Sequence, residues 1–298
     1  MDPLQRIEQA LEAAIEKGMG DDSPPLLRQA VRHAVLTPAS RVRPRLCLAV
    51  ALACGDDVPA VSDAAAASLE LLHCASLVHD DLPCFDDAAM RRGQPSVHRA
   101  YGERLAVLAG DGLIVLAFEN LAWHTLRHPE RLAPLLMIVG RAVGLKDGIV
   151  AGQAWECESE VDLSEYHRQK TAALFAAATE AGAAAAGRNP AEWRTLGANL
   201  GEAYQVADDL RDVAGDAGEL GKPVGQDAAH ERPSAVAALG VDGAVARLAE
   251  LTREAVGSIP TCPGAEKLQA LVLGEMQRLL PPTLADEFRR RLSAAGDS

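Results

Sequence analysis

The chain has 298 residues, of which 48% are hydrophobic and 24% charged, a composition that fits an ordinary globular protein and excludes a disordered chain. Its formal net charge is −13, and no cluster of lysines and arginines offsets it, so we expect no nucleic-acid partner. No apolar run approaches the ~20 residues that cross a bilayer, and the amphipathic, charged start is unlike a signal peptide, so we expect a cytoplasmic location and no membrane span.

The predicted secondary structure is helical throughout. Aromatic residues make up only 3%, and no stretch alternates β-branched and polar residues as a strand does, so the expected fold class is all-α. In chain order, helices are predicted over residues 4–18, 25–36, 42–54, 60–80, 102–125, 129–158, 163–187, 191–214, 240–258, 263–280 and 283–294. Asp162 and Glu165 form a predicted capping box for the seventh helix, and Gly215 and Gly218 follow the eighth. Because no linker or change of composition divides the halves, residues 1–298 are expected to form one large domain.

Four aspartates fall within the eight residues from Asp80 to Asp87, with Pro83 among them. On an unbroken helix Asp80 and Asp86 would lie roughly 240° apart and would not face one ion. Pro83 lacks an amide hydrogen and disfavours helix in its predecessor, so it lets the residues between Asp81 and Asp86 bulge outward. Such a bulge brings the two carboxylates back together.

A second group of aspartates, Asp208, Asp209 and Asp212, lies on another predicted helix. Asp208 and Asp212 are four residues apart and are therefore neighbours on one helix face, where like charges repel by roughly a few tenths of a kcal/mol. Either group alone is typical of a solvated acidic surface or a helix N-terminus. Two groups, each after an apolar helical run, favour Mg²⁺, which takes one or two protein carboxylates and adds water and phosphate oxygens. The sequence therefore predicts a site for magnesium and phosphate.

A series of motifs runs in order along nearly the whole chain. It comprises Arg41-Val42-Arg43-Pro44, "ELLHCASLVHDDLPCFDDAAMRRGQPSVH" from Glu70, "LAGDGL" from Leu108, Gly152-Gln153, "HRQKTAALF" from His167, "GEAYQVADDLRD" from Gly201 and "LGKPVGQD" from Leu220. In this series the chain resembles the trans-isoprenyl diphosphate synthases, and among them the bacterial geranylgeranyl diphosphate synthases of carotenoid pathways. The resemblance implies an all-α fold, a single large helical bundle of the isoprenoid synthase type with a central cavity.

The resemblance implies that magnesium, three ions per active site, is bound by the two aspartate groups. The implied ligands are Asp80 and Asp86, with Asp81 supporting them, and Asp208, with Asp209 and Asp212 in or near the shell. These ions would hold the diphosphate of an allylic substrate, which is dimethylallyl, geranyl or farnesyl diphosphate.

The resemblance also implies how cationic side chains meet the two substrates. Arg91 would contact the allylic diphosphate, whereas Arg92, Arg43 and His73 would bind isopentenyl diphosphate, since guanidinium groups match phosphate oxygens. Lys170 and Lys222 would complete the cationic wall around the leaving group, and Arg232 stands where a lysine is usual.

The resemblance implies a reaction that depends on electrostatic stabilisation of a departing diphosphate. Ionising the allylic C–O bond leaves a carbocation and a diphosphate, and preorganised positive charge stabilises the departing anion. By resemblance, Thr171, Gln205 and the carbonyl group of Lys170 turn their dipoles toward the cation, the alkene of isopentenyl diphosphate attacks it, and the released diphosphate takes the proton. No nucleophilic side chain is required.

One departure from the family lies before the arginine motif. Most relatives have Gly-Gly-Lys there, whereas this chain has Pro38-Ala39-Ser40, so Ser40 takes a lysine position in the isopentenyl diphosphate site. If another cation replaces that lysine, Arg41 is the first candidate. Glu156 and Arg232 also differ from the usual residues but keep their charge.

The expected product is geranylgeranyl diphosphate, C20. In short-chain relatives a bulky aromatic residue five positions before the first aspartate closes the product tunnel, and here that position is Ala75, next to Ser76. Leu72, Leu71 and Ser68 precede Ala75 by three, four and seven residues and are candidates for a deeper floor. Alternatively, Ala75 is a good helix former at a close helix crossing.

Other functions stay open at this point. They are farnesyl diphosphate synthesis (C15), a non-catalytic subunit of a prenyl synthase, and a class I terpene cyclase. A non-catalytic subunit would have lost aspartates from one motif, and a cyclase would have a different second motif and more aromatic residues. Family analogy favours a homodimer.

Overall fold

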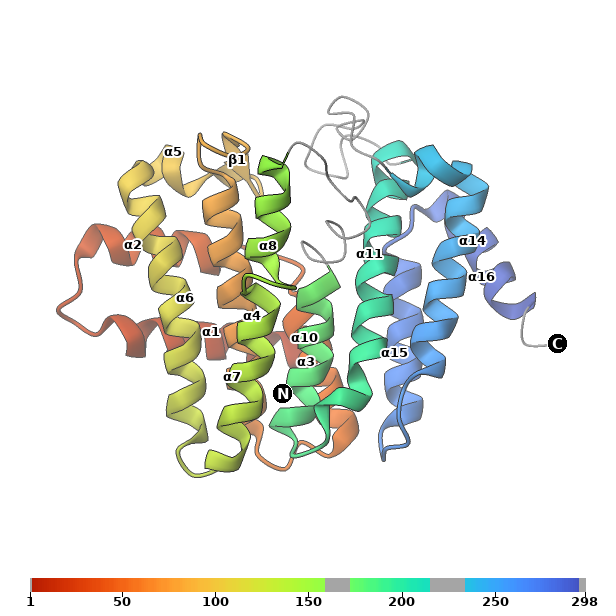
Figure 1. The fold of residues 1–298 in the computed structure, drawn as a ribbon, viewed down its shortest axis with the longest axis horizontal. Coiled ribbons are helices and arrows are strands. Elements are labelled where there is room, and N and C mark those ends of the chain that lie inside the picture. The colour runs from red at the N-terminus through yellow and green to blue at the C-terminus, as the bar shows by residue number, and fades with distance from the viewer. Residues whose placement is uncertain (1, 159–171, 215–233, 295–298) are drawn as a thin grey trace. The chain divides into compact units, whose positions relative to one another are not determined.

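The computed structural model describes residues 2–158, 172–214 and 234–294 of the chain (Figure 1). These residues fall into two compact units. The first unit contains residues 1–143 and 177–190, and the second contains residues 144–176 and 191–298. The expectation of one domain stays a prediction.

The first unit is built around one central helix. Its elements are α1 (Pro3–Met19), α2 (Pro25–Leu36), α3 (Val42–Cys54), α4 (Pro59–Asp80), β1 (Met90–Arg91), β2 (Gln94–Pro95), α5 (Val97–Tyr101), α6 (Glu103–Thr125), α7 (Pro129–Val143) and most of α10 (Ala173–Ala185). Helix α4 packs most extensively along α6 and also contacts α1, α2 and α3. A run of four buried alanines, Ala64–Ala67, lets neighbouring helices approach α4 closely. The C-terminal part of α4, from Ser68 to Asp80, carries most of the candidate site residues of the first unit.

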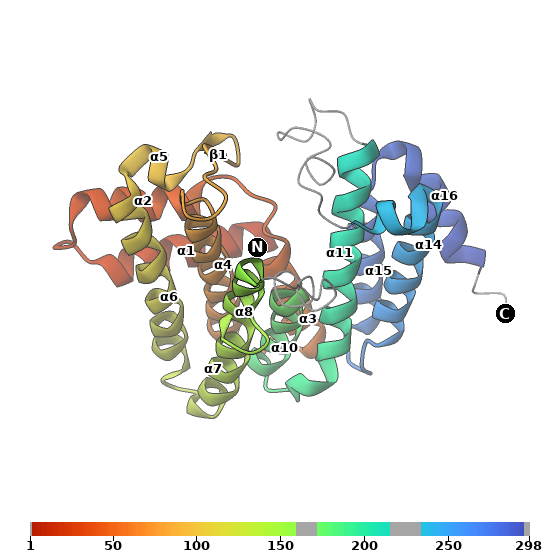
Figure 2. The ribbon, with the colours of Figure 1, turned by 45° about the horizontal axis from the view of Figure 1, so that its top comes forward.

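Polar contacts fix the register between α4 and α6, which lie side by side in Figures 1 and 2. The buried amide of Asn120 donates to Ala64 O at 3.0 Å and to Ser68 Oγ at 3.1 Å. The Ser68 hydroxyl in turn donates to Ala117 O at 2.9 Å. Nearer the end of α4, the ring of His79 lies against Gly110, where a Cβ atom would come within 2.1 Å of Nε2. Sliding one helix along the other would therefore leave buried polar groups unsatisfied.

By length and composition alone, two helices of the described chain are apolar enough to cross a membrane, α4 and α6. This is weak evidence, because the core helix of a soluble protein meets the same criterion. The most apolar window of α4 is 78% buried inside the protein, as expected of a core helix, whereas that of α6 is 44% buried. Helix α6 therefore has an apolar side that its own unit does not cover.

A short antiparallel hairpin, β1 and β2, follows the first aspartate group, where no strand was expected. Arg91 pairs with Gln94, and the turn residues Arg92 and Gly93 both have positive φ values, of 53° and 75°. Positive φ at both positions is the geometry of a type I′ turn, which suits the twist of a tight hairpin. Because each strand has only two residues, no alternating pattern exists in the sequence to reveal it.

The second unit is also helical in its described part. It contains α8 (Ile149–Ala154), the 3₁₀ turn η1 (Trp155–Cys157), the start of α10, most of the 3₁₀ turn η3 (Pro190–Trp193), α11 (Arg194–Ala214), α14 (Ala235–Gly257), α15 (Ala265–Arg278) and α16 (Pro282–Ala294). Helix α11 packs along α14. It also approaches the segment that begins α10, where a Cβ atom on Gly201 would lie 2.6 Å from Ala172 Cα. These contacts position the second aspartate group, on α11.

Most of the predicted helices are present with shifted ends, and one of them is interrupted. The predicted helix 129–158 is interrupted over residues 144–148, where Gly144 and Gly148 flank a turn. The predicted helix 102–125 is present as α6, and a short helix that was not predicted, α5, precedes it and ends at Gly102, which adopts φ 86°. The predicted capping box at Asp162 and residues 163–171 lie outside the described residues, as do Gly215 and Gly218.

Candidate active site

The first aspartate group forms the outward bulge that Pro83 predicts. Helix α4 ends at Asp80, and the backbone N–H of Asp86 donates to Asp80 O at 3.0 Å, which closes a loop over residues 81–85. The side chain of Asp80 is half-buried and that of Asp86 is exposed. The chain thus returns Asp86 to the end of the helix that carries Asp80, so the bulge is confirmed, while the convergence of the two carboxylates on one ion stays a prediction.

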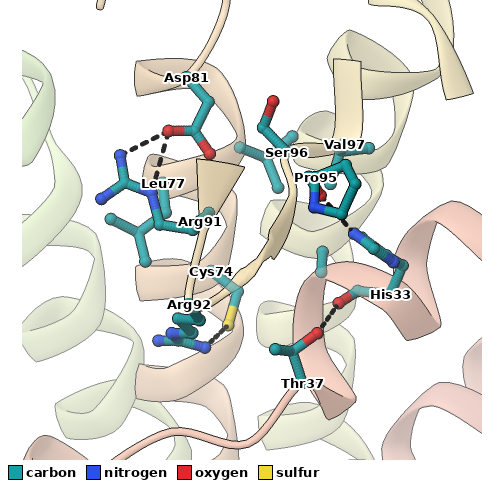
Figure 3. Close-up of a pocket in the computed structure, with 12 residues that line it drawn as sticks. His33, Thr37, Cys74, Leu77, Asp81, Arg91, Arg92, Pro95, Ser96 and Val97 are labelled. Atoms are coloured by element: carbon teal, nitrogen blue, oxygen red, sulfur yellow. Dashed lines mark hydrogen bonds and ion pairs between the residues drawn. The ribbon is translucent and has the colours of Figure 1, made fainter. Parts of the chain in front are cut away.

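Asp81 lies beside these residues but faces inward. Its side chain is 3% exposed, and Oδ1 accepts hydrogen bonds from Arg91 Nε at 2.9 Å and Arg91 Nη2 at 2.5 Å (Figure 3). Burial raises the pKa of Asp81, against the opposing effect of Arg91. Burial lowers the pKa of Arg91, but its hydrogen bonds to Asp81 and the charge of that carboxylate raise it. The pKa of Arg91 therefore stays above its usual value. Asp81 therefore orients Arg91, and its role as a metal ligand stays a prediction.

Arginines from two further elements gather on the side of α4 that carries His73 and Glu70. Arg43 Nη1 lies 3.2 Å from His73 Nε2. Arg92 Nη2 lies 3.5 Å from Glu70 Oε1, and Arg92 Nη1 lies 3.9 Å from the Sγ atom of Cys74 (Figure 3). Burial and then the surrounding arginines, Arg43 first, hold the pKa of His73 well below its usual value, so its ring is neutral at neutral pH. This cluster is rich in donors for an anion.

A small pocket that is partly open to solvent adjoins this cluster. Figure 3 shows its lining, which comes from α2, α4 and the β1–β2 hairpin. On the α2 side, His33 Nε2 lies 2.7 Å from Pro95 O, and Thr37 Oγ1 donates to His33 O at 2.6 Å. The pocket is therefore bounded by the same hairpin that carries the two adjacent arginines.

Arg41 is not a replacement for the missing lysine. Its side chain is fully buried, Nη1 contacts Glu70 Oε1 at 2.7 Å, Nε contacts Glu8 Oε1 at 2.8 Å, and Nη2 donates to Val35 O at 2.6 Å. Burial alone would lower the pKa of Arg41, but its hydrogen bonds to the carboxylates of Glu8 and Glu70 raise the pKa above its usual value. Arg41 was the first candidate for a replacement cation, and this was wrong because its guanidinium group is already bound by Glu8, Glu70 and Val35 O. Ser40, one residue earlier, is exposed.

The second aspartate group lies on α11, near its C-terminal end. Asp208 is half-buried and forms an ion pair with Arg211 at 2.7 Å, and Asp212 is buried. Asp209 Oδ1 accepts from Gln205 Nε2 at 3.0 Å, and its Oδ2 accepts from the backbone N–H of Ala235 at 2.7 Å. Ala235 is the first residue of α14, so Asp209 ties the start of α14 to α11. Like Asp81, Asp209 is a buried member of its group, as is Asp212.

The residues present suit magnesium. The donor set that the two groups offer is carboxylate oxygen, the hard ligand that this ion prefers, and each group has a half-buried aspartate beside a buried one. Within the described ranges, no three His, Cys, Asp or Glu side chains are grouped to hold a metal by themselves. Mg²⁺ does not need such a cage, since it completes its octahedron with water and substrate phosphate.

The proposed chain-length residues all lie on α4. Ala75, Leu72, Leu71 and Ser68 are buried, and Ser76 is half-buried with its hydroxyl donating to His73 O at 2.8 Å. Because Ser68 and His79 both contact α6, Ala75 lies on the α6-facing side between them, seven residues after the first and four before the second. Neither the tunnel nor the alternative of close helix packing is decided by this placement.

Four of the proposed residues, Lys170, Thr171, Lys222 and Arg232, lie outside the described residues. Glu70 was quoted within a motif without a role, yet it is 2% exposed and contacts two arginines. A glutamate within an otherwise apolar helical run was the available signal.

Comparison with known proteins agrees with this arrangement. Residues 24–268 match the sequence model of a family described as polyprenyl synthetase. The chain is 54% identical to the geranylgeranyl diphosphate synthase of Cereibacter sphaeroides, over 94% of this chain and 98% of that protein. It is 52% identical to the one from Rhodobacter capsulatus, over 90% and 93%. A solved geranyltransferase from Helicobacter pylori, complexed with magnesium and isoprenyl diphosphate, has a TM-score of 0.78 at 31% identity and covers 92% of this chain and 96% of that chain.

Proposed function

Because this chain belongs to the polyprenyl synthetase family and is therefore a prenyltransferase, we propose that it is a geranylgeranyl diphosphate synthase. It joins isopentenyl diphosphate to an allylic diphosphate and stops at C20. The observation that carries the product assignment is the 54% identity to a geranylgeranyl diphosphate synthase over 94% of this chain. The small side chain at Ala75 supports it, since a bulky residue at this buried position would take up space that a longer product needs.

Isopentenyl diphosphate binds at Arg43, His73 and Arg92 in this proposal. The three side chains come from α3, α4 and the hairpin turn, and Arg43 lies within 3.2 Å of His73. His73 is neutral, so one ring nitrogen donates a hydrogen bond without adding charge. Guanidinium groups provide the charge and the paired donors that phosphate oxygens need. Ser40 borders this site in place of a lysine.

The allylic diphosphate is held on the side of the aspartates. Asp80 and Asp86 of the first group and Asp208 of the second would hold Mg²⁺, with three ions in all, because they are the half-buried or exposed members of their groups. When bound, these ions supply positive charge to the leaving diphosphate. Arg91, oriented by Asp81, donates to the same diphosphate.

The reacting carbon chain needs a different environment from the diphosphates. Gln205 donates its amide N–H to Asp209 at 3.0 Å, which orients the side chain, and in this proposal its carbonyl dipole is turned toward the allylic cation. Lys170 and Thr171 complete this part of the proposal, as Lys222 and Arg232 complete the cationic wall. The alkene attacks the cation, and the proton lost from the new product passes to the released diphosphate.

The test uses the purified full-length protein. Isopentenyl diphosphate and labelled farnesyl diphosphate are incubated with it, once with Mg²⁺ and once with EDTA, and the dephosphorylated products are separated by length. A labelled C20 product that requires the metal is the expected result. With geranyl diphosphate as the starter, accumulation of C15 and no use of farnesyl diphosphate would make the enzyme a farnesyl diphosphate synthase, and no product from any starter would overturn the proposal.

Two further features belong to the proposal. The two units form one synthase domain, which is supported by a family match that runs through both of them. The enzyme is a homodimer, which is supported by the uncovered apolar side of α6, where Val107, Leu108, Val115 and Leu126 are 41–79% exposed. A cytoplasmic location stays a prediction.

A further inference from the structure

Two arginines with left-handed backbones converge on one buried carboxylate. Arg41, at the N-cap of α3, has φ 49°, and Arg92, in the hairpin turn, has φ 53°. Their guanidinium groups both reach Glu70 Oε1, at 2.7 Å and 3.5 Å. Glu70 is 2% exposed and lies on α4.

The left-handed conformation is unfavourable for both arginines. It costs a residue with a Cβ atom about 1–2 kcal/mol, and glycine or asparagine usually occupies such positions. Such backbones persist when the surrounding structure holds them in place. The shared feature that holds both is Glu70, because it contacts both side chains from a third element.

The hairpin is fastened to α4 at two points. Asp81 binds Arg91, and Glu70 binds Arg92. Glu70 precedes Asp81 by eleven residues, so the two carboxylates lie about three turns apart on the same helix face. Figure 3 shows the two adjacent arginines reaching in different directions, Arg91 toward Asp81 and Arg92 toward Cys74. The two carboxylates therefore fix where each guanidinium lies.

The contacts of the two arginines with Glu70 differ in kind. Arg41 has short bonds to Glu70, Glu8 and Val35 O and is fully buried. Among the described residues, Arg92 makes long contacts to Glu70, at 3.5 Å, and to Cys74, at 3.9 Å, and its side chain is 18% exposed. Glu70 thus neutralises Arg41 and only steers Arg92, whose planar fork has five N–H donors.

We propose that Glu70 is a positioning residue for isopentenyl diphosphate, a role that rests on the proposed function. It sets the direction of Arg92 directly. It also holds Arg41, whose left-handed N-cap starts α3 and thereby places Arg43, two residues later, beside His73. The glutamate itself does not touch the substrate, since its charge is taken by the arginines.

The test is the substitution Glu70→Gln in the full-length protein. It removes the charge that steers Arg92 and keeps the size of the side chain. The KM for isopentenyl diphosphate is expected to rise about tenfold, the loss of roughly one charge-assisted hydrogen bond, while the KM for farnesyl diphosphate and kcat change less than about twofold. Glu180→Gln is the matched control, because Glu180 is also a buried glutamate of the first unit, paired with Arg141 at 2.6 Å.

A purely structural role for Glu70 makes a different prediction. Thermal stability would fall in both variants, and neither KM would change at a temperature where circular dichroism shows them folded. That result would overturn the inference. If the glutamine variant does not fold, Glu70→Asp keeps the charge and shortens the reach, and the same selective rise in the KM for isopentenyl diphosphate is expected.

A double substitution separates direct from indirect action. In an Arg92→Lys background, Glu70→Gln is expected to raise the KM for isopentenyl diphosphate by a clearly smaller factor than in the wild type, because the fork that Glu70 steers is gone. Equal factors in both backgrounds would overturn the role of Arg92. A wild type that forms no prenyl product would overturn the proposed function, whereas an active wild type with an unchanged KM in Glu70→Gln overturns only this inference.

Discussion

Adjacent aspartates in this protein have different surroundings and should respond differently to substitution. Asp80 is half-buried at the end of α4, whereas Asp81 is buried against Arg91. The same contrast recurs on α11. Asp209 accepts hydrogen bonds from Gln205 and from the backbone N–H of Ala235, whereas Asp208 is half-buried. Removing an inward-facing aspartate leaves a buried donor unsatisfied and costs stability, and removing an outward-facing one should cost activity.

The first prediction concerns Asp80. Asp80→Ala is expected to lower kcat about a hundredfold, since a lost ligand misplaces charge that stabilises the leaving diphosphate, an effect commonly near ~3 kcal/mol. The melting temperature should change little, as circular dichroism will show. Asp57→Ala is the control, because it removes a largely exposed aspartate paired with Arg131. Wild-type turnover in Asp80→Ala, or full activity in excess EDTA, would contradict the metal site.

The second prediction concerns Ser40. Because Arg41 is already bound by Glu8 and Glu70, we expect no nearby cation to have replaced the missing lysine. Ser40→Lys should lower the KM for isopentenyl diphosphate severalfold, up to about tenfold, with kcat nearly unchanged, because the phosphate is bound equally in ground and transition states. Ala39→Lys adds the same charge one residue away and should not have this effect. An unchanged KM in Ser40→Lys would mean that the site is already electrostatically complete.

The third prediction concerns His73, whose pKa is depressed by burial and by Arg43, Arg92, Arg91 and Arg41. Below pH ~6.5 the unfolded chain takes up a proton on this histidine and the folded protein does not, so stability falls as pH falls, by at most about 1.4 kcal/mol per pH unit. Denaturant titrations at pH 7.5 and 5.5 should show a smaller loss in His73→Gln than in the wild type. Equal losses would mean that His73 titrates normally.

Residue identities in the site were largely predictable, and their pairings were not. The aspartates, Arg43, His73 and the hairpin arginines stand in motifs whose spacing is visible in the sequence. The partners of Arg41 are Glu8 and Glu70, which are 33 and 29 residues away. No local pattern shows which of several arginines meets which carboxylate, because that depends on how α1, α3 and α4 pack.

At the scale of elements, two helices had bounds that followed strong terminators in the sequence. Residues 25–36 and 42–54 were predicted with the bounds observed for α2 and α3. Pro25 begins the former, and Gly55, with φ 114°, ends the latter. The break over residues 144–148 was missed because two separated glycines weaken a helix without excluding it.

The fourth prediction concerns product length. Ala75 lies on the α6-facing side of α4, so a tyrosine ring there would occupy space between these helices beyond the aspartates. Ala75→Tyr is expected to shift the main product from C20 to C15 and to spare the earlier condensations, and chromatography of the dephosphorylated products measures this. Ala75→Ser, a change of almost no volume, should keep C20. If the tyrosine variant is folded and still makes mostly C20, the tunnel does not follow this face.

At the scale of the whole molecule, α6 indicates a partner. A helix that is apolar on all sides is normally buried on all sides, yet Leu108, Val115 and Leu126 are exposed at spacings of seven and eleven residues, which is one stripe along the helix. A second copy of the chain would cover this stripe by packing the same helix against it.

The fifth prediction tests that dimer. The wild type is expected to have twice the mass of one chain by light scattering, and Val115→Glu is expected to have the mass of one chain, because a charge would be buried at the interface. Met137→Glu on α7 is the control, since Met137 is 73% exposed and lies outside the stripe. A monomeric wild type, or a Val115→Glu variant that stays dimeric, would exclude this surface.

The two sides of α4 carry residues for different functions, and this affects how such an enzyme can evolve. Ser68, Ala75 and His79 face α6, while Glu70 and His73 face the arginines. Substitutions that alter one side of the helix leave the other side's contacts in place. Evolution, or a directed-evolution library restricted to the α6 side, can therefore change the product length while the enzyme keeps its binding of isopentenyl diphosphate.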